Sequence, residues 1–433
     1  MSLKNNVPAL PISKKLTIGL FGFGVVGKGL YDILQFTPAL QASIKKICIK
    51  NITKERPIPQ EHFTSNPAEL LNDGGINVIV ELIDDADAAF AIVKEALQKG
   101  KSVVSANKKM IAAHFEELLY LQHEYKAAFL YEASCCASIP IIRNLEEYYD
   151  NDLLSSVKGI VNGSTNFILT KIFEDGLSFK DALLLAQQSG FAESNPALDT
   201  EGHDAANKLS ILLAHAFGNI AAPSAFIYTG ITAIKQTDAD VARQKNLKIK
   251  LVANAQKINE NQLAAYVLPQ FVDAHDDLAN VSNEFNGLIT ESSFADKHFF
   301  KGKGAGAYPT AAAVLSDIAA LRYNYKYEYK KYLQQNKLVL TNNYYLKVFV
   351  SADDIIKIDK DYFEWIEEWH NEFNNSWAVG IIHAEKLQAN DWWKAPGISL
   401  ILCQSPVIEN IDYKKIGKLS LQLAGVIPLT NSK

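Results

Sequence analysis

The amino-acid sequence predicts an α/β protein whose N-terminal part is built on a doubly wound parallel sheet. Three observations support this fold class. The apolar stretch LTIGLF, residues 16–21, has the composition of a short buried strand; the glycine-rich stretch GFGVVG follows it at once; and strand-like and helix-like segments then alternate as far as about residue 132. Such alternation produces a Rossmann-type sheet whose ligand lies at the carboxyl ends of the strands.

The segments that follow the glycines can be assigned in order. We expect strands in KKICIK, NVIVEL, KSVVSA and AAFLYE, and helices over residues 25–34, 86–98 and 115–125. The strand segments are short and apolar, which is typical of a sheet covered on both faces.

The chain is too long for one ordinary hydrophobic core. With 433 residues, two or three domains are expected. We place a Rossmann-type nucleotide-binding domain at residues 1–132, completed by a returning segment near 303–325. An α+β domain for substrate binding and dimerisation follows at 133–322, and a small C-terminal α+β module occupies 338–433.

Composition and charge exclude several classes of protein. Hydrophobic residues make up 48% and charged residues 21%, with a net charge of −5 and no dense Lys/Arg tract, which argues against a nucleic-acid or membrane-surface partner. No apolar run approaches the roughly 18 residues of a membrane span, and the N-terminus lacks the apolar region of a secretion signal. The four cysteines include the adjacent pair Cys135 and Cys136, which fits neither a metal motif nor a disulfide framework. We expect a cytoplasmic protein.

The glycine-rich stretch matches the pattern G-x-G-x-x-G of dinucleotide-binding sites. The first glycine allows a tight turn, the second lets the backbone approach a pyrophosphate, and the third lets helix and strand pack closely. The helix that starts here offers free N–H groups to phosphate oxygens. The motif alone is weak evidence, but the strand before it and the helix after it favour a cofactor site. The predicted cofactor-binding residues are Gly22, Gly24, Val25, Val26 and Gly27.

The end of the second strand bears on which nicotinamide cofactor is used. NAD-selective sites place an acidic residue there to bind the ribose 2′-hydroxyl. Here the strand ends at Lys50, and Lys54 and Arg56 follow with a single glutamate between them. We therefore predict that NADP is preferred over NAD. The alternative is that these are solvated loop charges.

An acidic cluster precedes one lysine further along the chain. Glu193, Asp199, Glu201 and Asp204 come before Lys208 in the stretch GFAESNPALDTEGHDAANKLSILL. Asp204 and Lys208 are four residues apart, so they share one face of a helix that we expect to begin near residue 199 or 200 and to end near 218. A surface pair of this kind would contribute well under about 1 kcal/mol.

Five motifs in order connect this cluster to a known family. They are SANK from Ser105, YEAS from Tyr131 followed by IP, NGSTNFIL from Asn162, the acidic stretch itself and GAGAYPT from Gly304. With them the sequence resembles the homoserine dehydrogenases over roughly residues 16 to 325. The resemblance implies a monofunctional enzyme that interconverts L-aspartate 4-semialdehyde and L-homoserine with a nicotinamide cofactor, in threonine, methionine and isoleucine biosynthesis.

The resemblance also implies roles for individual residues. Lys208 would transfer the proton that the alkoxide needs after hydride addition, and Asp204 would orient it. Lys108, which alone would pass for a surface lysine, would lie near the reacting oxygen or the substrate carboxylate. The remaining assignments are Glu193 and Asp199 for the substrate ammonium, Gly163 and Ser164 for backbone and hydroxyl contacts to the substrate, and Ser105, Lys108 and Gly306 for the cofactor. Glu201 matches no assigned position, and stabilisation of the helix dipole suffices to explain it.

A monovalent cation, Na⁺ or K⁺, is a further implication of the resemblance. Its ligands would be the main-chain oxygens of Glu132, Cys135, Ala137 and Ile139, because converging carbonyls suit a hard cation. The family usually has glycines in this loop, where this chain has Cys136 and Ser138. The family also implies a homodimer or a higher homo-oligomer.

The last hundred residues give a weaker pattern. We expect a helix over residues 323–336, another near 362–373, and strands in YYLKVFVS, SWAVGIIHAEKL and GISLILCQS. The unit stands where many members of the family carry an ACT regulatory domain, so we predict a divergent ACT-like module. Its segment from Ser351 to Lys357 has neither the proline nor the glycine of the usual effector turn, which leaves regulation by threonine open.

Two other functions remain as alternatives. One is a Rossmann-type oxidoreductase that acts on a different amino-acid aldehyde or imine. The other is a cofactor sensor without catalytic activity. The joint presence of Lys108, Glu193, Asp199, Asp204 and Lys208 argues against the sensor.

Overall fold

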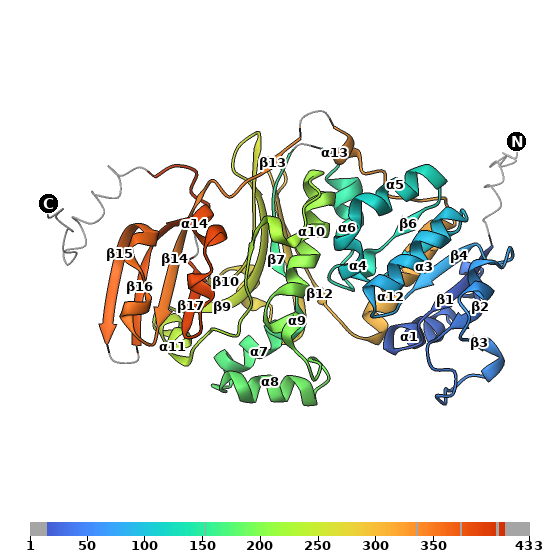
Figure 1. The fold of residues 1–433 in the computed structure, drawn as a ribbon, viewed down its shortest axis with the longest axis horizontal. Coiled ribbons are helices and arrows are strands. Elements are labelled where there is room, and N and C mark those ends of the chain that lie inside the picture. Colours follow the sequence, from blue (N-terminus) through green and yellow to red (C-terminus); the bar gives the residue numbers. More distant parts are fainter. Residues whose placement is uncertain (1–14, 152, 335–336, 373–374, 404–406, 412–433) are drawn as a thin grey trace, which may run out of the picture. The chain divides into compact units, whose positions relative to one another are not determined.

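The chain folds into two compact units, each with its own sheet (Figure 1). A computed structural model describes residues 15–151, 153–334, 337–372, 375–403 and 407–411. The first unit comprises residues up to 148 together with 305–328, and the second comprises 149–304 together with the residues from 329 onward. Two predictions fall outside the described residues. The absence of a secretion signal concerns residues 1–14, and the end of the C-terminal module concerns residues 412–433.

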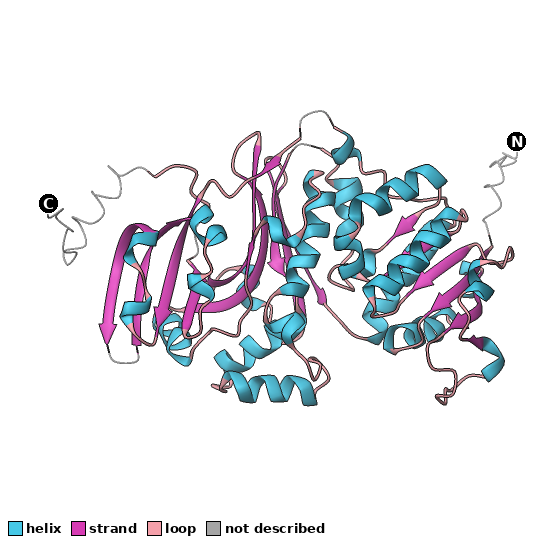
Figure 2. Cartoon of the chain, in the orientation of Figure 1, coloured by secondary structure: helices cyan, strands magenta, loops and turns pink. Residues whose placement is uncertain are grey.

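The first unit contains a six-stranded, entirely parallel sheet with the order β3-β2-β1-β4-β5-β6 (Figure 2). This order is that of a doubly wound nucleotide-binding sheet, so the predicted Rossmann-type fold is confirmed. Its strands are β1 (Leu16–Phe21), β2 (Ala42–Cys48), β3 (Phe63–Thr64), β4 (Val78–Glu81), β5 (Ser102–Ser105) and β6 (Phe129–Leu130).

The helices of this unit follow the predicted alternation. They are α1 (Val25–Leu34), α2 (Ala68–Leu71), α3 (Ala86–Gln98), α4 (Lys108–Ala113), α5 (Phe115–Tyr125), α6 (Ile141–Arg143) and α12 (Ala307–Leu321), with short 3₁₀ helices at Pro38–Leu40, Gln60–His62 and Glu132–Ser134 and a π-helical turn at Asn144–Tyr148. The three helices predicted before residue 130 are confirmed. Asp85 caps α3 by accepting from the N–H groups of Asp87 and Ala88, which fixes where that helix starts.

Helix α12 comes from a much later part of the chain and packs on α1. The two helices can pack this closely because residue 29 is a glycine. A Cβ at Gly29 would lie only 2.9 Å from the carbonyl oxygen of Ala307. The returning segment therefore belongs to the first unit.

The second unit is built on an eleven-stranded, largely antiparallel sheet. Its main path runs β12-β11-β7-β9-β10-β17-β14-β16-β15, and β8, β13 and β17 each pair in parallel with β10. The strands are β7 (Leu154–Ile160), β8 (Ile227–Tyr228), β9 (Leu247–Lys257), β10 (Gln262–Asp273), β11 (Phe285–Ser292), β12 (Asp296–Lys303), β13 (Val339–Leu340), β14 (Tyr345–Ala352), β15 (Phe363–Glu372), β16 (Asn375–His383) and β17 (Ile398–Leu402). The helices are α7 (Gly163–Glu174), α8 (Phe179–Gln188), α9 (Ala197–Thr200), α10 (His203–Phe217), α11 (Gln236–Gln244), α13 (Lys330–Leu333) and α14 (Ala384–Ala389).

The C-terminal strands share a hydrophobic core with β10. Tyr266 and Leu268 of β10 are buried together with Val348 of β14 and Leu400 of β17. The strands from β13 to β17 thus continue the sheet of the second unit, and side chains from β14, β16 and β17 pack into its core. The segment from Ser351 to Lys357, which stands where an ACT domain has its effector turn, forms the end of β14 and the turn after it.

The predicted helix near 362–373 is wrong, because Phe363–Glu372 form strand β15. Phe363, Ile366 and Trp369 recur every three residues, which reads as helical spacing, and all three contact one core cluster. The register of β15 on β16 shifts between Phe363 and Trp365 and again between Ile366 and Glu368. Each irregularity adds a residue, so a spacing of three can face one side of a strand.

The predicted helix over 323–336 is also largely wrong. Helix α12 ends at Leu321, and in the described part only Lys330–Leu333 is helical. Tyr325, Tyr327 and Tyr329 alternate with polar residues, which is the period of extended chain. Tyr327 is buried, and its carbonyl oxygen accepts a hydrogen bond of 2.9 Å from Gln122 Nε2.

Candidate active site

The predicted catalytic pair lies on α10 in the second unit. Lys208 Nζ donates to Asp204 Oδ2 over 2.7 Å, and the two residues are 7% and 6% exposed. Because both charges are buried, the pair differs from a solvated surface pair, and removing either partner would leave the other uncompensated. Lys208 Nζ also donates to the carbonyl oxygen of Val161, just after β7, over 2.7 Å, so acceptors from two separate parts of the chain hold the ammonium group.

Asn162, which the sequence analysis did not select, connects three parts of this site. Its Nδ2 donates to Asp199 Oδ1 over 2.7 Å and to Asp204 Oδ2 over 2.8 Å, while its Oδ1 accepts from the N–H of Thr165. Asn162 is 4% exposed and caps the N-terminus of α7. An asparagine directly before a helix start was the available signal, since asparagine is a preferred N-cap residue.

The predicted start of the lysine-bearing helix is wrong. Asp199 belongs to the short helix α9, and Gly202 interrupts the chain with φ of +86° before α10 begins at His203. Left-handed backbone of this kind favours glycine. The break turns the chain so that Asp199 and Asp204 approach the same amide of Asn162 from different helices.

Gly163 and Ser164 form the first turn of α7. A Cβ at Gly163 would lie 2.6 Å from the carbonyl oxygen of Glu284, so the position is closed to larger residues. The hydroxyl of Ser164 donates to the carbonyl oxygen of Phe191 over 2.5 Å, which ties α7 to the loop that carries Glu193. Glu193 is exposed, and its own carbonyl oxygen accepts from Gln187 Nε2.

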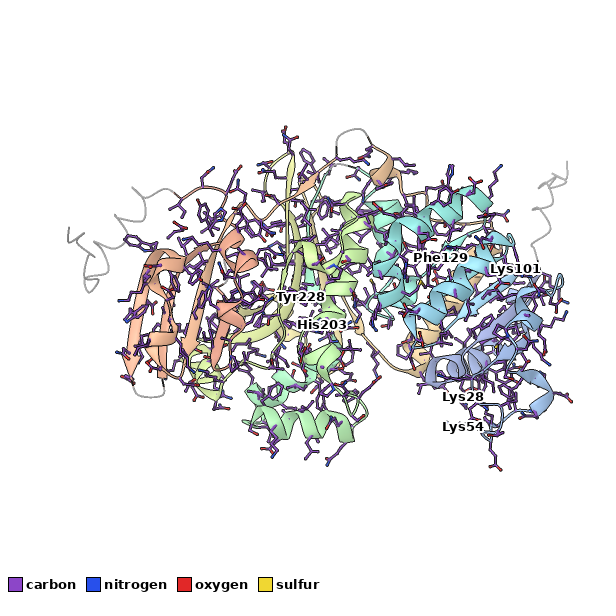
Figure 3. All side chains as sticks on the ribbon, viewed as in Figure 1. Lys28, Lys54, Lys101, Phe129, His203 and Tyr228 are labelled. Carbon is purple, nitrogen blue, oxygen red and sulfur yellow. The ribbon has the colours of Figure 1, made fainter. Side chains whose placement is uncertain are left out.

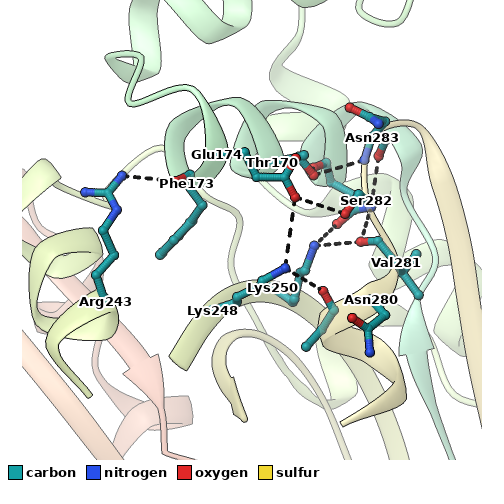
Figure 4. A network of polar contacts seen from close by, with 12 residues as sticks. Thr170, Phe173, Glu174, Arg243, Lys248, Lys250, Asn280, Val281, Ser282 and Asn283 are labelled. Atoms are coloured by element: carbon teal, nitrogen blue, oxygen red, sulfur yellow. Dashed lines mark hydrogen bonds and ion pairs between the residues drawn. The ribbon is translucent and has the colours of Figure 1, made fainter. Parts of the chain in front are cut away.

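A buried polar network holds α7 in place (Figure 4). Lys250 is 3% exposed, and its Nζ donates to Val281 O over 2.6 Å and to Asn166 Oδ1 over 3.0 Å. Asn166 Nδ2 donates in turn to the carbonyl oxygens of Val281, Asn283 and Phe285. Burial lowers the pKa of Lys250 to about 7, which the nearby Lys248 and Lys301 favour and Glu174 opposes. The network fixes the helix whose first turn adjoins Asn162.

In the glycine loop of the first unit, packing requires Gly22 and Gly27 but does not require Gly24. Gly22 has φ of +93°, and a Cβ there would collide with the carbonyl of Leu82; a Cβ at Gly27 would collide with the carbonyl of Gly22. Gly24 differs, because its φ of −81° suits any residue and nothing among the described residues lies within 4 Å of a Cβ built there. The space beside Gly24 is therefore free for a ligand, which fits a cofactor pyrophosphate.

The first turn of α1 has no acidic residue and no side-chain cap. Val25 and Val26 belong to this turn, whose N–H groups have no partner within the helix and can bind phosphate oxygens. Gly306, at the N-terminus of α12, has φ of +120°, and the next residue contacts Gly29 of α1. The start of α12 therefore packs against the second turn of α1 within the first unit.

The chain after β2 lies beside the glycine loop, since Gly22 N donates to Cys48 O over 2.9 Å. Lys50 follows and is exposed. Arg56 places its guanidinium over the ring of Phe63, 5.1 Å from the centroid, and donates to Lys54 O. The cations predicted to favour NADP thus follow the strand end.

Ser105 ends β5 and is fully buried. Its hydroxyl donates to Glu81 Oε2 over 2.6 Å and accepts from the N–H of Asn107. Burial raises the pKa of Glu81 to about 7. Ser105 therefore uses its side chain to hold β4 and β5 together at their carboxyl ends. Lys108 begins α4 and is half-buried, and Asn107 caps that helix.

The predicted cation loop is buried and irregular. Cys136 and Ala137 have positive φ values of 57° and 41°, a left-handed backbone conformation that favours glycine. The main-chain oxygens of Glu132 and Ile139 already accept from the N–H groups of Cys135 and Ile141. A carbonyl has two lone pairs, so these oxygens remain able to bind a cation. Burial and the neighbouring Asp317 raise the pKa of Glu132 to about 8.

Two features are absent from the described part of the chain. No group of three or more His, Cys, Asp or Glu side chains is arranged to hold a metal ion. None of the described helices is both long and apolar enough to span a bilayer.

Comparisons with known proteins agree with this geometry. Family models described as the homoserine dehydrogenase NAD binding domain and as homoserine dehydrogenase match residues 22–132 and 140–319. The homoserine dehydrogenase of Bacillus subtilis (strain 168) is 33% identical over 320 residues, which cover 72% of this chain and 74% of the relative. That of Helicobacter pylori is 36% identical over 314 residues, covering 71% and 74%.

Solved structures show the same similarity. The crystal structure of a homoserine dehydrogenase from Thiobacillus denitrificans superposes with a TM-score of 0.79 at 26% identity, covering 90% of this chain and 99% of that one. A hyperthermophilic archaeal homoserine dehydrogenase mutant in complex with NADPH gives 0.62 at 26% identity, covering 73% and 100%. On its sequence motifs, fold and relatives, the chain belongs to the homoserine dehydrogenase family of oxidoreductases.

Proposed function

We propose that the chain interconverts L-aspartate 4-semialdehyde and L-homoserine, that it prefers NADP, and that Lys208 transfers the proton. The observation that supports this best is the buried pair of Lys208 and Asp204, held by Asn162 and Val161. The first unit binds the cofactor and the second carries the proton-transfer chemistry.

The bound nicotinamide supplies or accepts the hydride. In aldehyde reduction, hydride addition leaves an alkoxide, which Lys208 Nζ protonates, and the resulting neutral amine is recharged from solvent. In alcohol oxidation, neutral Lys208 accepts the hydroxyl proton as the hydride leaves. Asp204 orients the amine in both directions and stabilises its charged form.

Carboxylates suit the other end of the substrate. We assign its α-ammonium to Asp199, whose position is fixed by Asn162, and to Glu193 on the loop tied down by Ser164. Gly163 offers a backbone N–H. Lys108 remains our proposed cation for the substrate carboxylate or the reacting oxygen.

The cofactor assignment uses the residues of the glycine loop and the strand ends. Gly22 and Gly27 shape the turn, the space beside Gly24 receives the pyrophosphate, and Val25, Val26 and Gly306 provide helix-start N–H groups. Ser105 keeps the strand ends in place. Lys50 would attract the 2′-phosphate that distinguishes NADP from NAD.

Two more features of the family are proposed for this chain. A Na⁺ or K⁺ ion would bind the main-chain oxygens of Glu132, Cys135, Ala137 and Ile139 and would stabilise the buried loop. The active species would be a homodimer or a larger homo-oligomer. Replacing K⁺ and Na⁺ by choline in the assay tests the ion, and sedimentation velocity tests the assembly.

The decisive experiment is homoserine-dependent reduction of NADP⁺ and NAD⁺ by the wild type and by two variants at one position. Lys208→Ala removes the amine, while Lys208→Arg keeps a positive charge that does not deprotonate. We expect both variants to lose kcat by about 10²–10⁴-fold. Near-normal turnover by Lys208→Arg would show that the charge matters and that proton transfer occurs elsewhere. A wild type that neither oxidises homoserine nor reduces L-aspartate 4-semialdehyde would refute the assigned reaction.

A further inference from the structure

The carbonyl oxygen of Val161, one of the two acceptors that hold Lys208, has a second donor. Asn286 Nδ2 donates to it over 3.1 Å, while Lys208 Nζ donates to it over 2.7 Å. Asn286 is fully buried in β11, and Lys208 lies on α10, whose first residue, His203, is labelled in Figure 3. A carbonyl oxygen has two lone pairs, so these two donors together use its capacity.

Asn286 is held rigidly in this position. Its strand pairs with β7 on one side and with β12 on the other. Gly304, just after β12, packs so closely that a Cβ there would collide with the side-chain amide of Asn286. The carbonyl oxygen of the preceding residue, Phe285, accepts from Asn166 of α7 over 3.1 Å. Both the backbone and the side chain therefore keep the amide of Asn286 against Val161.

The contact with Val161 is what the amide of Asn286 provides to the protein. Its other end, Oδ1, is buried and has no hydrogen-bond partner among the described residues. Leaving a buried amide oxygen without a donor is unfavourable, so folding stability alone would favour an apolar side chain of similar size here. The polar side chain is therefore explained by its donor, which serves the oxygen that also binds Lys208.

Each acceptor of Lys208 is itself fixed by an asparagine. Asp204 Oδ2 accepts from Asn162, and Val161 O accepts from Asn286. A lysine ammonium is tetrahedral, with three N–H groups that rotate together about the bond to Cε. Two acceptors in fixed places stop that rotation and set the direction of the third N–H. A shift of Val161 O would therefore turn the position through which Lys208 exchanges a proton.

We propose that Asn286 is a positioning residue for proton transfer. It fixes Val161 O and so aims Lys208 Nζ at the substrate oxygen, when homoserine gives up its hydroxyl proton and when the alkoxide receives one. This role rests on the proposed function of Lys208. Without the amide donor, the Val161 carbonyl can turn and the amine turns with it, so proton transfer slows while the substrate and the cofactor still bind.

The test compares Asn286→Leu with Asn254→Leu in homoserine oxidation at saturating cofactor. Leucine is similar in size to asparagine but has no donor. Asn254 is the matched control because it is also buried, at 3% exposed, in the same sheet, and its Nδ2 donates to Gln256 Oε1. We expect Asn286→Leu to lower kcat by about 10–10²-fold, the effect of misplacing a catalytic group, with little change in the KM for homoserine. Asn254→Leu should keep a kcat close to that of the wild type. Asn286→Ala is the second variant if Asn286→Leu does not fold.

A double-mutant cycle and a crystal structure make the test specific. Because Asn286 acts only through Lys208, adding Asn286→Leu to Lys208→Ala should leave the residual rate of that variant unchanged. The crystal structure of Asn286→Leu should show Lys208 Nζ more than about 3.5 Å from Val161 O, beyond hydrogen-bonding distance.

The proposal is overturned by any of three results: Asn286→Leu keeps the wild-type kcat, it slows Lys208→Ala by the same factor as it slows the wild type, or the contact between Lys208 and Val161 persists. Two patterns separate its failure from that of the proposed function. An inactive Lys208→Ala beside a fully active Asn286→Leu refutes only the role of Asn286. Normal turnover by Lys208→Ala refutes the proposed function, and the role of Asn286 with it.

Discussion

Asn162 and Asp204 are joined by a 2.8 Å hydrogen bond between two buried side chains that lie 42 residues apart in the sequence. The same amide binds Asp199, so a single neutral group sets the spacing of two carboxylates beside Lys208. Without it, the buried Asp204 and the partly exposed Asp199 would each lose a hydrogen-bond donor.

Asn162→Ala should therefore lower kcat while leaving the fold intact. Leaving a buried acceptor without its donor costs about 1–3 kcal/mol, which corresponds to about tenfold to a hundredfold in rate. The measurement is homoserine oxidation at saturating cofactor, with circular dichroism as the control for folding. An unchanged kcat would mean that Lys208 and Asp204 keep their geometry without Asn162.

Gly24→Ala and Gly27→Ala should separate cofactor binding from packing. A methyl group at Gly24 meets only open space, so the melting temperature should stay the same while the KM for the cofactor rises about tenfold or more. A methyl group at Gly27 meets the carbonyl of Gly22, so that variant should lose about 1–3 kcal/mol of stability. If Gly24→Ala binds the cofactor normally, no pyrophosphate lies there.

Lys50→Glu should reverse the cofactor preference. A carboxylate at this strand end would repel a 2′-phosphate and accept a hydrogen bond from a free 2′-hydroxyl. We expect the ratio of kcat/KM for NADP to that for NAD to fall by about tenfold to a hundredfold, the effect of removing one charged hydrogen bond. Lys15→Glu, at a lysine before β1, is the control for net charge. An equal fall in both variants would contradict a specific role for Lys50.

Lys250→Met should flatten the dependence of stability on pH in the alkaline range. The folded state lowers the pKa of Lys250 from 10.5 to about 7. Between these values the unfolded chain binds more protons, so this residue makes the free energy of unfolding rise with pH. Methionine removes that contribution along with the contacts to Asn166 and Val281. Denaturant titrations of both proteins at pH 7, 8 and 9 should show a smaller rise for the variant, and parallel curves would argue against a lowered pKa.

Much of the first unit could be predicted because its signals are local. The glycine spacing, the short apolar strands and the helices over 25–34, 86–98 and 115–125 each depend on neighbouring residues, and the structure contains them. The pairing of Asp204 with Lys208 follows from helical spacing in the same way.

The errors arose where distant contacts override a local pattern. The spacing of Phe363, Ile366 and Trp369 suits a helix, and only pairing with β16 through two register shifts makes it a strand. Asn162 could be read as a helix cap, but its bonds to Asp199 and Asp204 depend on how three helices come together. The break at Gly202 was hidden inside an acidic run whose charges suggested an ordinary helix start.

The pairing of β17 with β10 has a consequence for protein engineering. Gln270 meets Leu402 in this pairing, and Tyr266 and Leu268 bury their side chains against residues contributed from beyond position 344. Deleting the chain after residue 337 would uncover an apolar face and a free strand edge, both of which promote aggregation. The C-terminal region therefore cannot be deleted or exchanged as an independent domain. A truncated protein would need polar substitutions along β10 to stay in solution.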